Sequence, residues 1–398
     1  MSDLPVIRLR PKSKPQAIRH GFPWVFADEV VTDRRTRAIP PGAFALLEDA
    51  ERQPLALVTV NPNSKIIGRV MDADPGARID GDWLRARLAR ALALRERLYD
   101  APFYRLVHAE ADGLPGLVID RFGDRAVIQP KAAWADRMAD DIAAALAAVT
   151  GVSTVILNGQ GRARGLEGLE ERTGVLLGSA PAAPVEVPMN GAIYLADLMG
   201  GQKTGLFYDQ RPNHAFAQRL ARGARVLDVF SHVGGFGLAA LAAGADSATC
   251  VDGSAAALAL AEGGARAMGA GDRLSVTQSD AFKAMEALAG EEARFDVVIC
   301  DPPAFAPSKP ALEAGLRAYE RVAKLAAPLV APGGYLVLCS CSHAADLTAF
   351  RNVSARGIGR GGRRGQLIHT GQAGPDHLTL PQLAETGYLK ALFFRLDG

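Results

Sequence analysis

Two cysteines separated by one serine lie at the end of an apolar run near the C-terminus. The run "GYLVLCSCSHAAD" spans residues 334–346 and places Cys339 and Cys341 where a strand should end. Strand ends in open α/β sheets border clefts, so a thiol there can meet a ligand rather than a core. Thiols can act as nucleophiles, so the position raises the question of what chemistry they could do at this strand end.

Carboxylates close several other apolar runs of the same region. Asp228 ends "ARVLD" and Asp252 ends "ATCVD". A ligand could place a cationic amino-acid end near the first carboxylate and donate hydrogen bonds from a ribose diol to the second. S-adenosylmethionine carries both of these groups. Asp280 is placed to meet the adenine amino group, with Phe282 stacking nearby.

Asp301 heads a D-P-P turn after the run "RFDVVIC". The two prolines hold an extended, rigid backbone beside a reacting centre. The alternative is a helix N-cap, a position that aspartate favours.

The elements that position these residues form an alternating α/β pattern. Residues 224–269 predict strand, glycine loop, helix, strand, acid and helix, the opening of a doubly wound sheet. Gly234, Gly235 and Gly237 do not fit G-x-G-x-x-G, so a pyrophosphate cradle is disfavoured. One glycine loop is weak evidence alone, because tight turns use glycine for steric reasons.

Two further regions precede this one. Short β-type runs from Val6 to about Val70 predict a small all-β module. Residues 83–99 form a helical pattern, residues 106–130 three strands, 135–149 a second helix and 154–158 another strand. The Ala- and Pro-rich stretch 178–188 marks a boundary. We therefore expect a multidomain α/β protein with domains at 1–75, 76–185 and 186–398.

Composition limits the class of protein. A chain of 398 residues with 48% hydrophobic residues predicts two or three domains, and a formal net charge of +2 leaves any polyanion contact to local patches. Neither a membrane-length apolar stretch nor a signal sequence is apparent, which predicts a soluble cytoplasmic protein. Four cysteines without a C-x-x-C pair argue against disulfides and a metal site.

Basic residues occur in two clusters. The first 37 residues hold eight Lys or Arg against four acids, interleaved with Phe22, Trp24 and Phe26. Trp24 and Phe26 alternate as one buried face of a strand, with the charges as a solvated rim, and a phosphate-binding role for the basic residues stays open. Residues 347–375 hold five arginines and no acid, and their glycines argue against a rigid helix through 357–365. We weigh a solvated loop against RNA backbone contact there and favour the latter slightly.

At this point the sequence resembles a known family. The segments "DLMGGQKTGLFYDQR", "DVFSHVGGFG", "DPPAF", "CSCSH" and "GYLK", in this order, look like the 23S ribosomal RNA cytosine-C5 methyltransferases that carry an N-terminal PUA domain. "RHGFPWVF" is similar to the PUA opening and "ADGLPGLVIDRFG" to the central domain. The resemblance implies a PUA-like RNA-binding β-barrel, a small central α/β domain and a Rossmann-like methyltransferase domain.

The resemblance also implies a mechanism. These enzymes add a cysteine thiolate to carbon 6 of cytosine, which activates carbon 5. In the family pattern the nucleophile is the cysteine between two serines, which is Cys341 here, although a small buried residue is the alternative. Cys339 should project to the same side but deeper, as packing. Asp301 would hydrogen-bond the base at N3 and its amino group.

The resulting site expectations cover catalysis, cofactor and substrate, with no metal. The catalytic residues are Cys341 and Asp301. The residues expected to contact S-adenosylmethionine are Asp209, Gln210, Asp228, Phe230, Gly234, Gly235, Asp252, Ser254, Asp280, Ala281 and Phe282. The residues expected to contact ribosomal RNA are Arg19, Trp24, Lys203, Arg211, Pro302, Pro303, Phe305 and Lys309.

Some positions depart from the family pattern. Ala304 stands where related enzymes of another RNA class carry a second cysteine that assists product release, and where "DPPKF" has lysine. His232 replaces the aromatic of "FSYTGGF". The releasing group, the nucleotide modified, its assembly stage and the oligomeric state, including a homodimer, stay open. Two other functions remain: methyl transfer from the same cofactor to another target without covalent catalysis, and an RNA-binding or assembly protein with a vestigial site.

Overall fold

The computed structural model describes residues 4–201 and 204–397, and the chain packs into two compact units. The first unit comprises Met1–Ala182, Leu198–Gly205 and Pro375–Thr386. The second comprises Ala183–Asp197, Leu206–Gly374 and Gly387–Gly398. The predicted multidomain α/β architecture is confirmed. No helix among the described residues is long and apolar enough to cross a membrane.

A five-stranded sheet opens the first unit, in the order β1-β3-β4-β5-β2. Its strands are β1 (Val6–Arg8), β2 (Trp24–Phe26), β3 (Ala43–Glu48), β4 (Pro54–Val60) and β5 (Ile66–Asp72), with short helices α1 (Pro15–Arg19) and α2 (Arg34–Arg37). Val25 is fully buried in its core, whereas Trp24 and Phe26 on the other face of β2 are only half-buried. The interpretation of those two rings as a buried strand face is therefore wrong.

A second five-stranded sheet of this unit has the order β10-β9-β8-β7-β6. Its strands are β6 (Phe103–His108), β7 (Leu117–Phe122), β8 (Arg125–Pro130), β9 (Thr154–Gly159) and β10 (Arg172–Leu177). Its helices are α3 (Gly81–Leu98), α4 (Ala133–Arg137), α5 (Ala139–Thr150) and α6 (Arg162–Leu166). The predicted helix of residues 83–99 and the predicted strands up to residue 158 are confirmed, whereas the single helix predicted for residues 135–149 is two helices, α4 and α5, that meet at Met138.

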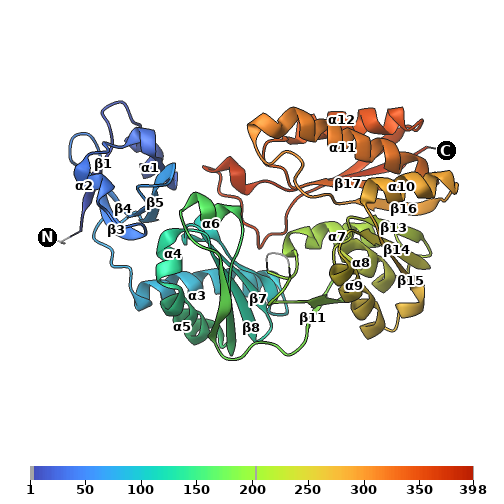
Figure 1. The fold of residues 1–398 in the computed structure, drawn as a ribbon, viewed down its shortest axis with the longest axis horizontal. Helices are drawn as coiled ribbons and strands as arrows, with labels where there is room; N and C mark the ends of the chain where they lie inside the picture. The colour runs from blue at the N-terminus through green and yellow to red at the C-terminus, as the bar shows by residue number, and fades with distance from the viewer. Residues whose placement is uncertain (1–3, 202–203, 398) are drawn as a thin grey trace. The chain divides into compact units, whose positions relative to one another are not determined.

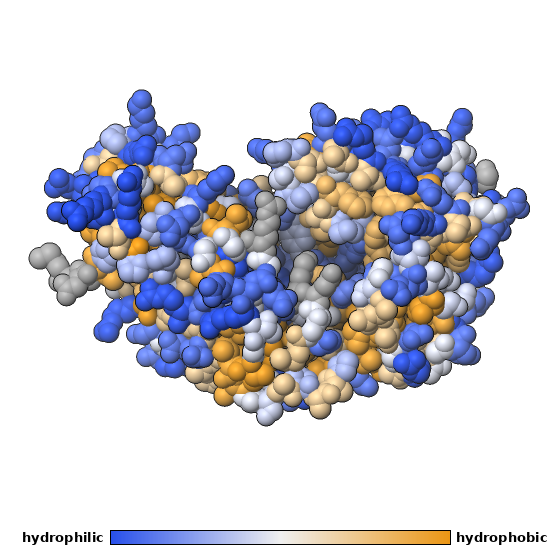
Figure 2. Space-filling model, viewed as in Figure 1, coloured by the Kyte–Doolittle hydropathy of each residue, from blue (hydrophilic) through white to orange (hydrophobic). Residues whose placement is uncertain are grey.

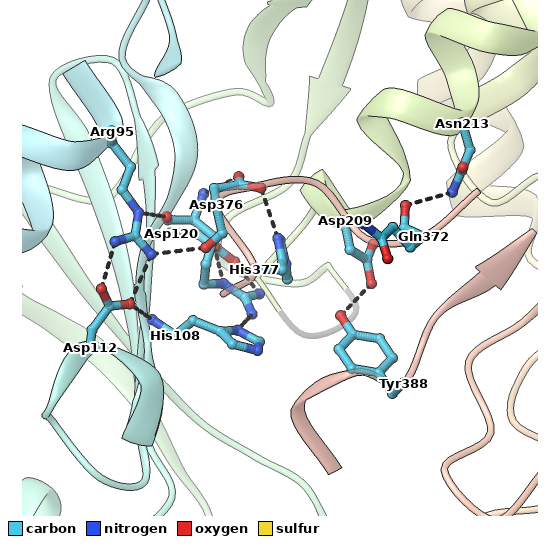
Figure 3. Close-up of polar contacts among 11 residues, drawn as sticks. Arg95, His108, Asp112, Asp120, Asp209, Asn213, Gln372, Asp376, His377 and Tyr388 are labelled. Carbon is cyan, nitrogen blue, oxygen red and sulfur yellow. Dashed lines mark hydrogen bonds and ion pairs between the residues drawn. The ribbon is translucent and has the colours of Figure 1, made fainter. Parts of the chain in front are cut away.

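A late segment of the chain completes the first unit. Arg95 of α3 is fully buried and donates to both carboxylate oxygens of Asp112, at 2.6 and 2.8 Å, and to the carbonyl of Asp376 at 2.8 Å (Figure 3). The Asp376 carboxylate accepts the amide of Arg105 at 2.9 Å. These bonds hold the segment Pro375–Thr386, which follows β18 in sequence, in the first unit.

A seven-stranded sheet forms the centre of the second unit, in the order β15-β14-β13-β16-β17-β19-β18. Its strands are β13 (Arg225–Val229), β14 (Ser247–Asp252), β15 (Leu274–Gln278), β16 (Phe295–Cys300), β17 (Val330–Ser340), β18 (Gly365–Gly371) and β19 (Lys390–Leu396). The first five in this order are parallel, whereas β19 and β18 pair antiparallel. A hairpin of β11 (Val185–Met189) and β12 (Ala192–Ala196) precedes them.

Helices cover both faces of this sheet (Figure 1). One layer contains α7 (Arg211–Gln218), α8 (Gly235–Ala242) and α9 (Ala255–Ala267); the other contains α10 (Ala281–Gly290), α11 (Leu312–Ala326) and α12 (Leu347–Arg360). Polar residues at strand ends start several helices: Ser254, Asp280 and Asp346 accept backbone amides as N-caps of α9, α10 and α12. Because these strands run parallel, the acids predicted at their ends lie at the same edge of the sheet.

The helix α12 corrects an expectation. The glycines of residues 357–365 predict the absence of a rigid helix, yet α12 continues through Gly357 and Gly359 to Arg360. A β-carbon on Gly357 would lie 2.5 Å from the Glu320 carbonyl and 2.6 Å from the Ala323 β-carbon. Close packing of α12 on α11 therefore requires glycine here, and burial of the helix outweighs the low propensity.

Candidate active site

The loop after β13 has a strained backbone next to the central strand end. Phe230 and His232 have φ of 63° and 50°, unusual for residues with a β-carbon, and Gly234 has φ of 79°. A β-carbon on Gly235 would lie 3.0 Å from the His214 ring. His232 packs on Phe207 with ring centroids 4.9 Å apart, so it takes the aromatic place in this loop. Strain of this kind is typical of ligand-binding loops.

Asp252 at the end of β14 holds this loop in place. Its Oδ2 accepts the amide of His232 at 2.9 Å, and its Oδ1 accepts the amide of Ser254 at 2.8 Å. The residue is half-buried, so lone pairs of its oxygens stay accessible at the edge of the sheet. This arrangement suits a carboxylate that accepts hydrogen bonds from a diol.

Asp228 is buried beneath the same loop. Its Oδ2 accepts the amides of Phe236 and Gly237 at 3.2 and 2.8 Å, at the start of α8. Burial raises the pKa of Asp228 to about 7, against the effect of these two amides. Its Oδ1 is buried and has no hydrogen-bond partner among the described residues. An ammonium group of a ligand would supply this partner. The residues therefore fit the amino-acid end of S-adenosylmethionine, while Asp228 also shapes the loop.

Three phenylalanines from neighbouring loops form an aromatic cluster. The ring centroids of Phe230, Phe282 and Phe305 lie 6.3 to 6.4 Å apart in each pair. Phe282 and Phe305 are half-buried, and Asp280 next to this cluster is exposed. Flat apolar walls with one adjacent carboxylate suit a purine ring and its amino group. Ala281 is buried behind them, at the start of α10.

We expect Asp252→Ala to weaken binding of S-adenosylmethionine by about 1.5–3 kcal/mol, the scale of hydrogen bonds to a charged group. Isothermal titration calorimetry measures this directly. Asp246→Ala is the matched control, because Asp246 is exposed at the opposite end of β14. Equal affinities of the Asp252→Ala protein and the wild type would remove the diol assignment.

Asp301, directly after β16, is oriented by an amide chain. Asn213 donates to the Gln210 side-chain oxygen at 2.6 Å, and Gln210 donates from its nitrogen to Asp301 Oδ2 at 2.9 Å. Gln210 is only 4% exposed, so its hydrogen bond to Asp301 is part of the packed structure. The bond also lies close to the expected cofactor region. Pro302 is buried and Pro303 is exposed. The proline rings fix φ at both positions, which makes the backbone after Asp301 rigid.

The two thiols at the end of β17 differ in exposure. Cys339 is 1% exposed, and burial raises its thiol pKa well above the usual value. Cys341 is partly exposed, whereas Cys250 and Cys300 are fully buried. Among the four cysteines of the chain, Cys341 is therefore the one that a ligand can reach.

Ser342 joins the cysteine turn to the D-P-P loop. The amide of Ala306 donates to Ser342 Oγ at 2.9 Å, and the hydroxyl of Tyr319 on α11 lies 2.8 Å from the same oxygen. The Tyr319 hydroxyl also accepts the amide of Phe305 at 3.4 Å. These bonds fasten the loop that carries Cys341 to the loop that begins with Asp301.

Other predicted residues of the second unit surround these loops. The Tyr388 hydroxyl donates to Asp209 Oδ2 at 2.6 Å, close to the Asn213 and Gln372 pair (Figure 3). Arg211 places its guanidinium 5.4 Å from the centre of the Tyr208 ring. Lys309 is exposed at the start of a short 3-10 helix, Lys309–Ala311.

The predicted RNA-contact residues of the first unit have protein partners. Arg19 pairs with Asp49 at 3.1 Å while its side chain stays 40% exposed. The Trp24 indole donates to Glu110 at 2.8 Å, so this side chain contributes to packing within the unit. Lys203 lies outside the described residues.

Arginines of α12 and of the segment after it also have internal partners. Arg356 and Arg360 both pair with Glu320 of α11, and Arg363 donates to backbone carbonyls including that of Val330 at 2.6 Å. Figure 2 shows hydrophilic residues along the outer edge of the α11 and α12 region, with apolar residues beside them. Three of the five arginines thus have protein partners, although the side chains of Arg356 and Arg360 stay 60% and 66% exposed.

Local sequence pattern does not single out four of the residues that hold the site together. They are Asn213, Tyr319, Ser342 and Lys390. Ser342 and Lys390 lie within the quoted segments "CSCSH" and "GYLK", and Asn213 lies two residues after "YDQR", so proximity to these segments was the available signal. Tyr319 carries no local signal, because only helix packing brings it to the loops.

Comparisons with known proteins show the family of the chain. The sequence matches the family described as S-adenosylmethionine-dependent methyltransferase over residues 133–395 and the PUA-like domain over residues 7–73. A protein of Deinococcus radiodurans named "Ribosomal RNA large subunit methyltransferase" is 35% identical over 412 residues, with 100% of this chain and 99% of the relative covered. "Ribosomal RNA large subunit methyltransferase I" of Aeromonas hydrophila is 34% identical over 390 residues, covering 96% and 98%.

Solved structures share the fold. A protein from Streptococcus mutans described as a SAM-dependent methyltransferase superposes with a TM-score of 0.82 at 17% identity, over 98% of this chain and 100% of that one. A methyltransferase complexed with SAH gives 0.82 at 18% identity, over 98% and 99%. The PUA-like and Rossmann-like parts of the predicted fold are therefore confirmed, and S-adenosylmethionine is the cofactor. The chain belongs to the S-adenosylmethionine-dependent methyltransferase family that includes these large-subunit ribosomal RNA methyltransferase relatives.

Proposed function

We propose that the protein transfers a methyl group from S-adenosylmethionine to carbon 5 of a cytosine in 23S ribosomal RNA, through a covalent adduct with Cys341. The observation that carries this proposal is the exposure of Cys341 in a turn that Ser342 fastens to the Asp301 loop. The names of the relatives support large-subunit ribosomal RNA as the substrate.

The chemistry assigns separate roles to the two loops. The Cys341 thiolate adds to carbon 6, and the electrons of the former C5=C6 bond move toward N3, which leaves carbon 5 enamine-like. A proton shared between Asp301 and N3 offsets the charge that develops there, while the 4-amino group donates to the other carboxylate oxygen. The cofactor supplies the methyl group. A base or water then takes the proton from carbon 5, the C–H electron pair re-forms the C5=C6 bond, and the C6–S bond breaks to expel the thiolate.

Nucleoside analysis tests this function. Ribosomal RNA stripped of modifications is incubated with the protein and methyl-labelled cofactor, digested and separated. We expect label in 5-methylcytidine. Label in a methylated purine would instead support methyl transfer to a nitrogen without a covalent adduct, and binding of RNA without transfer would support the RNA-binding alternative.

A groove in the PUA-like domain supports contact with RNA. It measures about 570 Å³ and is lined by Arg10, Lys12, Ser13, Lys14, Ala17, Phe22, Phe26, Asp28 and Glu29. The ring centroids of Phe22 and Phe26 lie 6.3 Å apart. Of the two acids that line the groove, Glu29 accepts a hydrogen bond from the backbone amide of Phe26. Aromatic rings beside basic side chains suit an unpaired, charged strand.

We expect the double variant Lys12→Gln and Lys14→Gln to bind ribosomal RNA more weakly and with a smaller salt dependence. Removing one phosphate contact lowers the slope of log affinity against log salt by about 0.7 on single strands. Fluorescence anisotropy at several salt concentrations measures this slope. Lys65→Gln, an exposed lysine of the same domain outside the groove, is the control. Slopes equal to that of the wild type in both proteins would exclude the groove from RNA binding.

A further inference from the structure

Lys390 is a buried lysine next to the cysteine turn. It opens β19, pairs opposite Ser340 of β17 and is only 8% exposed. Its Nζ donates to the carbonyls of Ser342 and Ala345, at 2.7 Å each. Lysines are rarely buried without a counter-charge or a full set of acceptors, so this position needs an explanation beyond packing.

The two carbonyls that bind Lys390 belong to the turn that carries Cys341. The Ser342 side chain is held separately, by the amide of Ala306 and the hydroxyl of Tyr319. The turn is thus fixed through its backbone by Lys390 and through one side chain by α11 and the D-P-P loop. Such double support keeps a reactive side chain within a narrow range of positions.

The charges around Lys390 favour an anion at Cys341. Burial lowers the pKa of Lys390, whereas Coulomb attraction to Cys341 and Asp346 opposes this change. The attraction is mutual, so the ammonium group also favours the thiolate form of Cys341. The other titratable groups of these elements are Tyr319, which interacts with Cys341, Asp301, which interacts with Cys339, and exposed His343, whose ring lies 5.5 Å from that of Tyr388.

We propose that Lys390 is a positioning residue for Cys341: its ammonium group fixes the turn of residues 340–345 and stabilises the Cys341 thiolate. The proposal deepens the function proposed above and rests on it for the reaction step alone, because thiol reactivity can be measured without RNA. During the reaction the same charge would favour the thiolate both before its addition to carbon 6 and after its expulsion.

Alkylation of Cys341 by iodoacetamide tests the proposal. The thiolate reacts and the thiol does not, so the rate against pH reports the thiolate fraction. Labelling should be selective, because the other three cysteines are buried, and peptide mapping with Cys341→Ala as the unlabelled control identifies the site. In the wild type we expect the midpoint of the profile to lie below that of the urea-denatured chain. A midpoint at or above the denatured value would overturn the proposal.

Variants separate charge from hydrogen bonding. Lys390→Gln keeps two N–H donors without the charge, Lys390→Met removes both, and Lys390→Arg keeps the charge. We expect the midpoint to move to higher pH in the Gln and Met proteins and to stay near the wild type in the Arg protein. Alkylation at pH 7 should become about tenfold slower each time the midpoint rises by one pH unit. Cofactor binding and thermal unfolding check that each variant folds.

Lys324→Gln on α11, which removes an exposed lysine, is the matched control and should leave the profile unchanged. A wild-type profile in folded Lys390→Gln and Lys390→Met proteins would refute the proposal. The failure of the proposed function has a different signature: methylation would persist in Cys341→Ala whatever the alkylation profiles show.

Discussion

Methyl transfer to ribosomal RNA is expected to vanish when Cys341 is replaced by alanine, while cofactor and RNA still bind. The thiolate is the proposed route to an activated carbon 5, so its removal should lower the rate to background rather than by a modest factor. Labelled-methyl transfer measures the rate, and calorimetry with S-adenosylmethionine shows that the site is intact.

Cys339→Ala is the matched control, because it shortens a buried thiol two residues before Cys341, within β17. We expect it to retain a substantial rate and to lose mainly packing stability. Loss of activity in Cys339→Ala with activity retained in Cys341→Ala would reverse the assignment of the nucleophile.

A trapping experiment examines the adduct itself. RNA with 5-fluorocytosine at the target position should form a stable complex with the wild-type protein, because fluorine blocks the elimination that frees the thiol. Peptide mapping should then find the linkage at Cys341. Full activity in Cys341→Ala together with no trapped complex would favour methyl transfer to a nitrogen.

Replacement of Asp301 with asparagine is expected to lower the maximal rate by about 10²–10³-fold, the effect of removing one group that stabilises developing charge. Asparagine keeps the shape of the side chain and can still accept from Gln210, which donates at 2.9 Å to the carboxylate. It cannot hold a proton for N3. Single-turnover kinetics with saturating RNA and cofactor isolates this step.

The control for this prediction lies on the same strand. Asp296→Asn changes a carboxylate near the opposite end of β16, where Asp296 accepts the amide of Arg225 at 2.8 Å. We expect near wild-type turnover from it. If Asp301→Asn also turned over at the wild-type rate, Asp301 would be an element of the loop rather than a catalytic residue.

Local pattern predicts the parts of the fold that short-range spacing controls. Apolar runs followed by Asp228, Asp252 and Asp301 predict the parallel strands and place their acids at one edge, because βα units bring strand ends together. The same pattern does not predict the hydrogen bonds that Asp228 accepts. Its bonds to the amides of Phe236 and Gly237 arise only when α8 folds back over β13.

The fold class, the cofactor and the residue types at the strand ends could all be predicted from the sequence, since these depend on motifs and short-range spacing. Which thiol is accessible, and what holds it, depends on the folded chain. The resemblance assigns the nucleophile to Cys341, which lies between two serines, and only burial shows that this thiol is the accessible one. The reason is that β17 lies between β16 and β19 up to Ser340 and the chain then turns outward. Tyr319, Ser342 and Lys390 meet at that turn from three distant segments, and contacts of such long range leave no periodicity in the sequence.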